Sequence, residues 1–389
     1  MTRKLPKITV WRAIFAAILA SGIYATYLRI FYGLGGSTNL SDQFPWGIWI
    51  AFDVMCGVGL AAGGFTLVAM VHIFNIEKYK PILRPAILTA FLGYLLVTVG
   101  LLYDLGRPDR LWHPLVMWNR HSVMFEVAWC VTLYSTVLFL EFLPVVLEKF
   151  GLHKPLRWIH KISVPLMILG VLLSTLHQSS LGTLFLIVPE KLYPLWYTPI
   201  LPLLFYVSAI AVGLAMTIFE SWHSSRAFGR ALELPLLMSM GRVLAVVLSV
   251  YLWIRFLDLS HRHAFALLAQ NRIETWLFAL EIALLVVPTA LLYLQRVRSS
   301  PGSLYACAVM VIFGFIANRL NVGSTGLEAG SGTHYIPRWS EVAVTLSIVA
   351  VGFAIFRLVA EYFPIFEAAK NEHEAAPMEQ TETHPVEVA

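Results

Sequence analysis

Charged residues are scarce in this sequence, since Asp, Glu, Lys and Arg make up only 13% of its 389 residues. Soluble globular domains carry roughly 25%. Hydrophobic residues reach 58%, and the mean hydropathy is +0.72. This balance excludes a soluble globular protein and indicates a chain embedded in a membrane. Basic loops beside a bilayer account for the formal net charge of +5, so we predict no nucleic-acid partner.

Cysteine is also scarce, with Cys56, Cys130 and Cys307 far apart in apolar stretches. The sequence has no spacing typical of iron–sulfur or zinc ligation, no CxxCH haem site and no Walker loop. A membrane b-type cytochrome needs histidine pairs that face each other, and only His177 lies within an apolar stretch away from the cytoplasmic ends. We therefore predict no metal site, no haem and no iron–sulfur cluster in this chain. Electrons would have to come from, or go to, a partner.

The apolar stretches are about twenty residues long, enough to cross roughly 30 Å of hydrocarbon as helices. They predict an all-α, polytopic membrane protein of about ten transmembrane helices, at 10–33, 47–74, 82–105, 121–143, 157–181, 199–222, 239–260, 273–296, 302–322 and 339–363. Acidic residues recur at similar positions in the fourth and eighth spans (Glu126, Glu281), which favours two four-helix bundles plus two flanking helices. We assign residues 1–364 to this transmembrane domain. Residues 365–389 have little apolar content and are predicted to form a disordered cytoplasmic tail.

The basic residues predict the orientation. Arg3, Lys4 and Lys7 precede the first apolar stretch without a small-residue cleavage site, so we expect a retained first helix. Ten spans place both termini on one side. If that side is cytoplasmic, more than half of the 28 Lys and Arg residues lie in cytoplasmic segments or helix ends. We predict a multi-pass inner-membrane protein with both termini in the cytoplasm.

Ionisable residues inside the apolar spans are candidates for function because burying a charge in a bilayer costs several kcal/mol. Four consecutive spans contribute such residues to one outer layer, and we expect them to face a common cavity: Asp53, Asp104, His121, Glu126, His177 and Gln178. Quinone chemistry suits this set, because a quinone needs hydrogen-bond partners for two carbonyl oxygens and a route for two protons. The alternative is that these side chains only join helices to one another.

Other polar residues lie deeper or toward the cytoplasmic side. Glu220 is a helix-end anchor or a step in a proton path, and Tyr94 and Arg84 would continue that path. Ordinary packing or contact with lipid headgroups explains them equally well.

Several motifs, in order along the chain, resemble the NrfD/PsrC family, in particular its HybB-like branch. They are residues 44–53 (FPWGIWIAFD), 84–88 (RPAIL), 125–126 (FE), 176–182 (LHQSSLG), 194–196 (PLW) and 218–220 (IFE). Residues 104–108 (DLGRP) instead resemble the wider NrfD-type pattern.

The resemblance implies a cofactor-free membrane subunit with a menaquinone or ubiquinone site near the periplasmic face. It also implies a docked ferredoxin-like iron–sulfur subunit, within a complex with a NiFe hydrogenase or a multihaem cytochrome c. Arg84, Tyr94, Glu126, His177 and Glu220 match positions that the family associates with quinone or proton handling. We assign Glu126 and His177 to catalysis, Asp53, Asp104, His121 and Gln178 to quinone binding, and Arg84, Tyr94 and Glu220 to a proton path.

The sequence thus predicts a membrane subunit of an oxidoreductase complex, of quinone reductase or quinol oxidase type, that passes electrons between a partner and menaquinone. The alternative is a proton-translocating or purely anchoring subunit without quinone chemistry of its own. A secondary transporter is a third class, but Pro165, Pro202 and Pro288 do not coincide with the polar layer, as broken helices at a transport site would.

Overall fold

The computed structural model describes residues 9–187 and 191–366, and within these ranges it is helical without strands. Ten helices are long and apolar enough to cross a membrane, which confirms the predicted all-α fold with ten spans. The residues before Thr9 lie outside the described ranges, as does the predicted tail from residue 367 on. Ile365, which we assigned to that tail, is fully buried in a cluster with Leu88 and Phe142.

Ten membrane-spanning helices follow one another along the described residues. They are α1 (Val10–Ser37), span 2 (Trp49–Ile73, comprising η1 Trp49–Val54, α2 Met55–Leu60, α3 Gly63–Val68 and η2 Ala69–Ile73), η3 (Glu77–Ile82) with α4 (Leu83–Asp104), α6 (Val123–Lys149), α7 (His153–Leu184), α8 (Leu201–Ala227), α9 (Leu234–His261), α10 (Ile273–Tyr293), α12 (Pro301–Leu320) with η7 (Asn321–Thr325) and α13 (Gly326–Ser331), and α14 (Trp339–Tyr362). Short helices lie in the connections: η4 (Pro108–Arg110), α5 (His113–Val116), η6 (Ala264–Gln270) and α11 (Gln295–Arg298).

Several helices extend beyond the apolar stretches that predicted them. We expected the fourth span to end at residue 143 and the fifth to begin at 157, whereas α6 continues to Lys149 and α7 begins at His153. The two helices pack against each other, and a helix continues through polar residues where a neighbour supports it. Hydropathy therefore located the spans but underestimated the lengths of α6 and α7 and overestimated that of α10, which ends at Tyr293 and not at residue 296.

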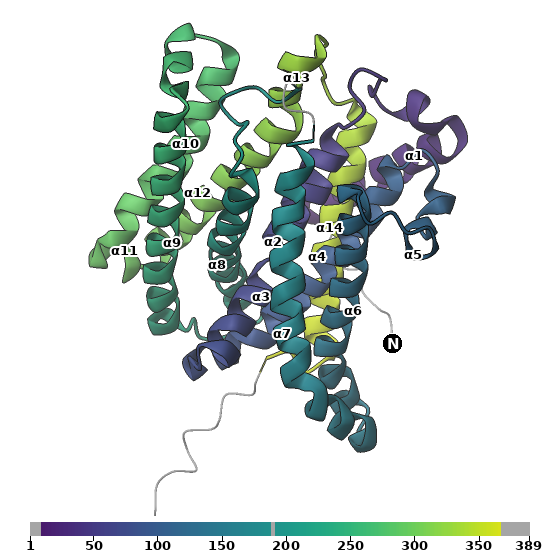
Figure 1. Ribbon diagram of the computed structural model, residues 1–389. Helices are drawn as coiled ribbons and strands as arrows, with labels where there is room; N and C mark the ends of the chain where they lie inside the picture. Colours follow the sequence, from purple (N-terminus) through teal and green to yellow (C-terminus); the bar gives the residue numbers. More distant parts are fainter. Residues whose placement is uncertain (1–8, 188–190, 367–389) are drawn as a thin grey trace, which may run out of the picture.

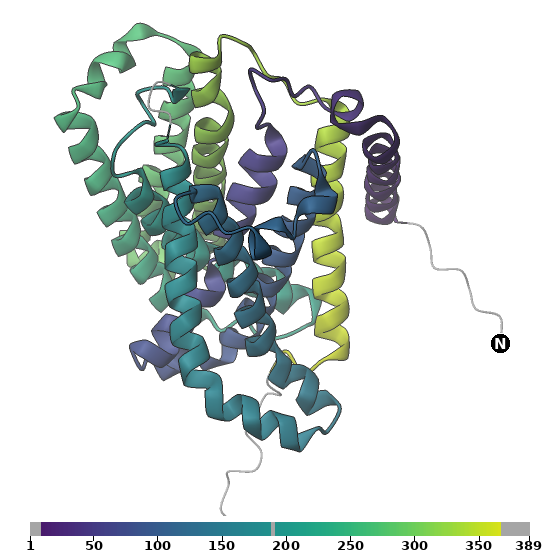
Figure 2. The ribbon, with the colours of Figure 1, turned by 45° about the vertical axis from the view of Figure 1, so that its right-hand side comes forward.

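The ten helices form two groups and a pair. Span 2, α4, α6 and α7 pack together, as do α8, α9, α10 and α12, and span 2 joins the two groups through contacts with α8 and α12. The pair consists of α1 and α14, and α14 also packs on α4. Figure 2 shows α1 at the edge of the molecule beside α14. The predicted grouping into two four-helix bundles stays an interpretation, in which α1 and α14 are the flanking helices.

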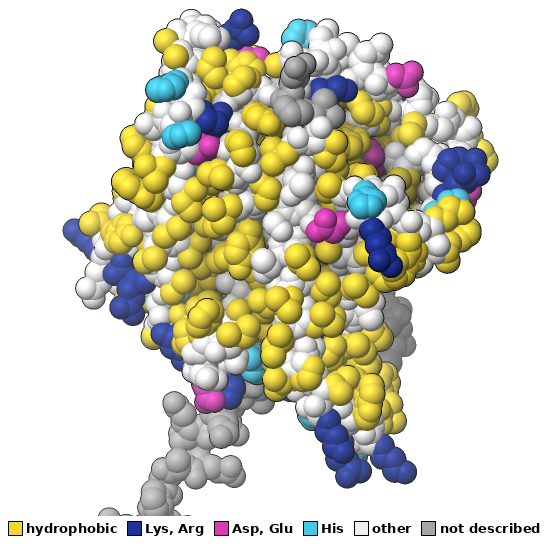
Figure 3. Space-filling model, viewed as in Figure 1, with side chains coloured by type: hydrophobic (Ala, Val, Ile, Leu, Met, Phe, Trp, Pro, Cys, Tyr) yellow, Lys and Arg dark blue, Asp and Glu magenta, His cyan; other side chains and the backbone are white. Residues whose placement is uncertain are grey.

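We name the two ends of the molecule by Figure 1. The connections that follow α1, α4, α7, α9 and α13 lie at the upper end, and those that follow span 2, α6, α8 and α10 lie at the lower end. Hydrophobic side chains cover most of the surface between the ends (Figure 3). Such a belt is expected of a protein surrounded by lipid.

Polar side chains tie the upper connections together. The Tyr335 hydroxyl donates to Glu341 at 2.5 Å and accepts from the backbone N–H of Ile48 at 3.0 Å. Burial, followed by the hydrogen bond to Glu341, raises the pKa of Tyr335 above its usual value, so the hydroxyl keeps its proton at neutral pH. This contact fastens the connection before α14 to the start of span 2.

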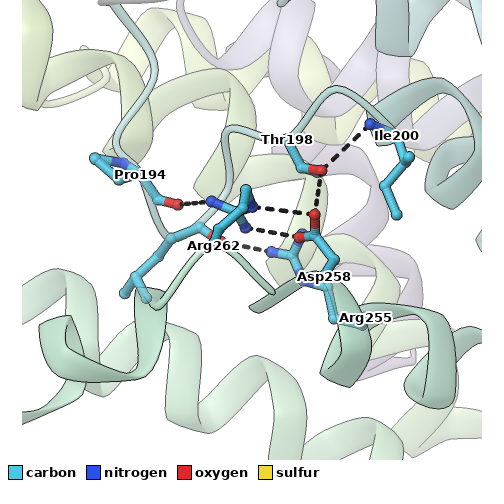
Figure 4. Close-up of polar contacts among 7 residues, drawn as sticks. Pro194, Thr198, Ile200, Arg255, Asp258 and Arg262 are labelled. Atoms are coloured by element: carbon cyan, nitrogen blue, oxygen red, sulfur yellow. Dashed lines mark hydrogen bonds and ion pairs between the residues drawn. The ribbon is translucent and has the colours of Figure 1, made fainter. Parts of the chain in front are cut away.

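A second set of contacts fastens the upper end of α9 to the connection between α7 and α8 (Figure 4). Asp258 forms an ion pair with Arg262 at 2.7 Å and accepts from the Thr198 hydroxyl at 2.5 Å. Arg262 and Arg255 donate to the carbonyls of Pro194 and Leu195, each at 2.8 Å. These contacts hold the connection over the second helix group.

Candidate functional site

Glu126 lies in the first turn of α6 at the upper end. The Ser122 side chain caps this helix by accepting from the backbone N–H of Phe125. The helix therefore begins at Val123, three residues before Glu126. The Ser180 hydroxyl, on α7, donates to the Glu126 carboxylate at 2.5 Å. Glu126 is exposed and Ser180 is buried, so the pair links the surface of the α6–α7 interface to its interior.

His177 and Gln178 lie below this pair, inside the first helix group. Both are fully buried, and the His177 ring packs edge-on against the Tyr94 ring with centroids 5.5 Å apart. Gln178 Nε2 donates to the Val58 carbonyl at 3.1 Å, whereas both His177 ring nitrogens have no hydrogen-bond partner in the protein. The Tyr94 hydroxyl and Gln178 Oε1 form no hydrogen bond of full geometry, but the Tyr94 hydroxyl lies against the Gln178 and Ser174 side chains. A buried polar atom without a partner costs about 1–3 kcal/mol, so these atoms indicate a place where water or polar ligand atoms bind.

The row of unpaired polar atoms continues downward between α6 and α7. Tyr134, Ser174 and Glu141 each have a buried oxygen without a partner. Tyr134 packs edge-on against Tyr94 with centroids 4.6 Å apart, and Tyr134 and Glu141 both lie beside Gly170 of α7. Glu141 is seven residues, about two turns, from Tyr134 on the same face of α6. We name the set Tyr94, Tyr134, Glu141, Ser174, His177 and Gln178 the polar row.

Arg84 lies at the lower end of the molecule, below the polar row. It forms an ion pair with Glu148 of α6 at 3.0 Å and donates to the Pro364 carbonyl. Glu148 follows Glu141 by seven residues on α6, so the ion pair lies two turns further down the same face. Polar groups therefore line one helix interface from Glu126 to Arg84.

The other predicted binding residues face elsewhere. Asp53, on span 2, is buried and accepts from the Thr345 hydroxyl of α14 at 2.8 Å. Asp104 ends α4 and is half-buried, with one oxygen unpaired. His121 is exposed in a turn before α6. The structure therefore brings Glu126, His177 and Gln178 to one helix interface, whereas Asp53 points to α14 and His121 to the surface.

Our expectation of one common cavity for the six residues is not met, because residues in sequential spans point to different neighbours. Asp53 and Val58 are five residues apart, and the two ends of this segment contact α14 and α7 respectively. A difference of five residues on a helix is about 140° around its axis, so shared depth did not imply a shared face.

Glu220, on α8, accepts from the Thr89 hydroxyl of α4 at 2.6 Å. It lines two hollows. The smaller, at the lower end, is also lined by Ser221, Ser225 and Arg230. The larger is an apolar cavity of about 460 Å³ between span 2, α4, α8 and α14, with Asp53 among its lining residues.

A different buried acid, Glu281 of α10, is fully paired. Its carboxylate accepts from Trp196 Nε1 and from the side-chain amides of Asn318 and Asn321, at 2.8–2.9 Å. Arg319 donates to Asn318 at 2.6 Å and lies over the Phe205 ring. This network joins α10, α12 and the α7–α8 connection, and the complete pairing of the Glu281 carboxylate indicates a structural role for this acid.

The sequence analysis missed Tyr134 and Ser174 as members of the polar row. Ser174 is one turn before His177 and Gln178, and Tyr134 is two turns from Glu141, so helical spacing contained the signal. Among residues 9–187 and 191–366, no group of three or more His, Cys, Asp or Glu side chains is arranged to hold a metal ion. The side chains of the polar row can donate and accept hydrogen bonds and can transfer protons.

Comparison with known proteins identifies relatives along nearly the whole chain. The family model described as polysulphide reductase, NrfD, matches residues 36–328. A protein of Nitratidesulfovibrio vulgaris is 39% identical over 359 residues, which cover 90% of this chain and 92% of that protein. The probable Ni/Fe-hydrogenase 2 b-type cytochrome subunit of Escherichia coli is 31% identical over 373 residues, covering 93% and 95%. The integral membrane subunit of menaquinone reductase from N. vulgaris is 29% identical over 392 residues, covering 93% of each chain.

Proposed function

This chain belongs to the polysulphide reductase NrfD family, and from that membership and the polar row we propose that it is the quinone-interacting membrane subunit of a respiratory oxidoreductase complex. The observation that carries the proposal is the set of buried, unpaired polar atoms directly below the Glu126–Ser180 pair. A membrane relative is named as a menaquinone reductase subunit, so we infer menaquinone as the substrate.

The polar row suits a quinone ring in its chemistry. A His177 ring N–H can donate to a quinone carbonyl oxygen, and Gln178 Oε1 can accept from a quinol hydroxyl. Reduction of a quinone to a quinol takes up two electrons and two protons, and oxidation releases them. We assign the protons on the ring oxygens to Glu126 and His177, and the electrons to a partner protein.

We place the partner at the upper end, near Glu126, and that end in the periplasm. The names of two relatives, a hydrogenase subunit and a menaquinone reductase subunit, support a redox partner. For this chain we propose a ferredoxin-like iron–sulfur subunit together with a NiFe hydrogenase or a multihaem cytochrome c. Asp104 and His121 lie at this end and, by our proposal, belong to the rim of the quinone site.

Protons reach the site from the lower end in this proposal. The route begins at the Arg84–Glu148 pair and passes Glu141, Tyr134 and Tyr94 to His177, along the interface of α6 and α7. Glu220 is the corresponding group on α8, where it lines a hollow at the lower end. Proton uptake from one side and electron exchange on the other would make turnover electrogenic, with each charge worth about 2.3 kcal/mol per 100 mV.

The test is quinone turnover by the purified complex with a soluble menaquinone analogue. We expect Glu126→Gln and His177→Ala each to lower kcat by about 100-fold or more, the usual contribution of a general acid–base group. Glu274→Gln, a carboxylate at the start of α10 far from the row, is the matched control and should leave kcat unchanged. Size-exclusion chromatography verifies that each variant still assembles. Unaltered quinone kinetics in both site variants would favour the alternative, a proton-translocating or purely anchoring subunit.

A further inference from the structure

The large cavity lies apart from the polar row, on the opposite side of span 2. Gly57 and Ala61 of span 2 and Gly93 of α4 line it, whereas Val58 and Tyr94, next to them in sequence, face the polar row. Its volume of about 460 Å³ falls in the range of small-molecule binding sites, about 300–1,000 Å³. Span 2 therefore separates the polar row from the apolar cavity.

The cavity is closed at its upper end and accessible at its lower end. At the upper end it is bounded by Asp53 and Ile348, which are 5% and 9% exposed. Further down α14 it is lined by Phe353, which is 61% exposed, and by the exposed Arg357. The opposite side is formed by Met216 and the residues below it on α8. The opening thus faces the bilayer between α8 and α14.

The lining is apolar except at its ends. Thr89 and Val97 both line the cavity and are eight residues apart, so it follows α4 for about 12 Å. At the closed end, Asp53 keeps a carboxyl group whose one oxygen accepts from Thr345. Polar side chains also line the open end, where the Thr89 hydroxyl donates to Glu220 and where His223 and Arg357 lie. A ligand that fills the cavity to its closed end therefore needs oxygen atoms that pair with the Asp53 carboxyl group, an apolar middle part along α4, and a continuation that leaves between α8 and α14.

We propose that this cavity is a second quinone-binding site, with the ring at Asp53 and the isoprenoid chain running along α4 to the opening between α8 and α14. A protonated carboxyl donates to a quinone carbonyl, and a carboxylate accepts from a quinol hydroxyl, so Asp53 pairs with either form of the ring. The acyl chain of a phospholipid fits less well, because its methyl end would face the carboxyl group without a hydrogen bond. The identity of the ligand rests on the proposed function, but the site does not overlap the polar row.

The experiment measures binding and not turnover. The purified complex is labelled with a photoreactive azido-quinone that carries an isoprenoid tail, and labelled peptides are mapped by mass spectrometry. We expect label on α8 and α14, which line only the cavity, in addition to label on α6 and α7, which line only the polar row. Val349→Trp fills the cavity and should remove the first set of labels while leaving the second.

The chain offers a matched control for this variant. Val349 and Val351 are 38% and 37% exposed on α14, but only Val349 lines the cavity, so Val351→Trp should leave both sets of labels unchanged. Asp53→Leu keeps the cavity open and removes the partner of the ring, and should weaken labelling near residue 53 by about tenfold, as loss of a hydrogen bond of about 1.4 kcal/mol would.

Label on α8 and α14 that is absent from the wild-type complex, or that persists in both Val349→Trp and Asp53→Leu, overturns the proposal. So does native mass spectrometry in which Val349→Trp displaces a phospholipid and no quinone. A complex that shows the predicted labels but reduces no quinone would contradict the proposed function and leave this site in place.

Discussion

Individual acids within the spans of this protein differ in how completely their oxygens are paired. Glu281 has three donors on its two oxygens, whereas Glu141 has an oxygen without any partner and Glu126 has one serine donor. A paired buried carboxylate contributes to one fixed arrangement of side chains, while an unpaired one costs free energy until water or a ligand binds. The pairing of each residue therefore separates structural acids from candidate functional ones.

The first prediction concerns Glu281→Gln. The new amide cannot accept at its nitrogen, so at least one donor among Trp196, Asn318 and Asn321 loses its partner. We expect the variant to lose about 1–3 kcal/mol of stability and to keep quinone turnover in the folded fraction. Thermal unfolding followed with a thiol-reactive dye measures the loss, because Cys56, Cys130 and Cys307 are buried until the protein unfolds. An unfolding temperature equal to that of wild type would contradict the structural role.

The sequence could identify these acids but not their partners. Glu126 and Glu281 both occupy apolar spans and looked equivalent, which is why they suggested a repeat. Trp196 and Asn318 come from other elements, 85 and 37 residues from Glu281, and contacts over such separations leave no local pattern. The exposure of His121 was likewise unpredictable from hydropathy, because the chain makes a turn before α6 begins.

At the scale of helices, span 2 and α8 form a close backbone contact between the two groups. A side-chain carbon on Gly213 of α8 would lie 2.7–2.9 Å from the backbone of Ala62 and Gly63. Backbone atoms cannot move aside as a flexible side chain can. The close approach of the two helices therefore requires a residue without a side chain at position 213. The glycine-rich sequence of residues 57–64 predicted close helix approach, but not that α8 would be the partner.

The second prediction follows from this contact. Gly213→Ala should separate span 2 from α8 and destabilise the protein by about 1–3 kcal/mol, the usual cost of overpacking. Gly302→Ala on α12 is the control, since nothing lies within 4 Å of a carbon added there. The half-life of the purified protein in detergent at elevated temperature compares the two variants. Equal half-lives would show that the helices adjust at no measurable cost.

The regular spans were predictable because hydropathy reports directly on contact with lipid. Hydropathy alone was sufficient to locate helices such as α9 and α14. Span 2 is different, because it contains two π-helical segments, Trp49–Val54 and Ala69–Ile73. A π-helical turn rotates the following residues relative to a regular helix, which changes the face on which Asp53 lies. The irregular geometry of span 2 is one reason why the six residues do not share a cavity, and the exposure of His121 in the turn before α6 is another.

For the whole molecule, the orientation in the membrane determines the side on which the partner binds and the side from which protons are taken up. Lys154 and Arg157 lie at the lower end beside Lys149, and Asp109 lies in the upper connection after α4, where Arg107 pairs with it. The excess of basic residues at the lower end predicts that this end is cytoplasmic.

Cysteine labelling tests this orientation. In a background with the three buried native cysteines replaced by alanine, Asp109→Cys and Lys154→Cys each place one thiol at an exposed position, at opposite ends of the molecule. A membrane-impermeant maleimide added to intact spheroplasts should label Asp109→Cys at once and Lys154→Cys only after permeabilisation. The reverse pattern would put the Glu126 end in the cytoplasm, and the partner protein and the source of protons would then have to exchange sides.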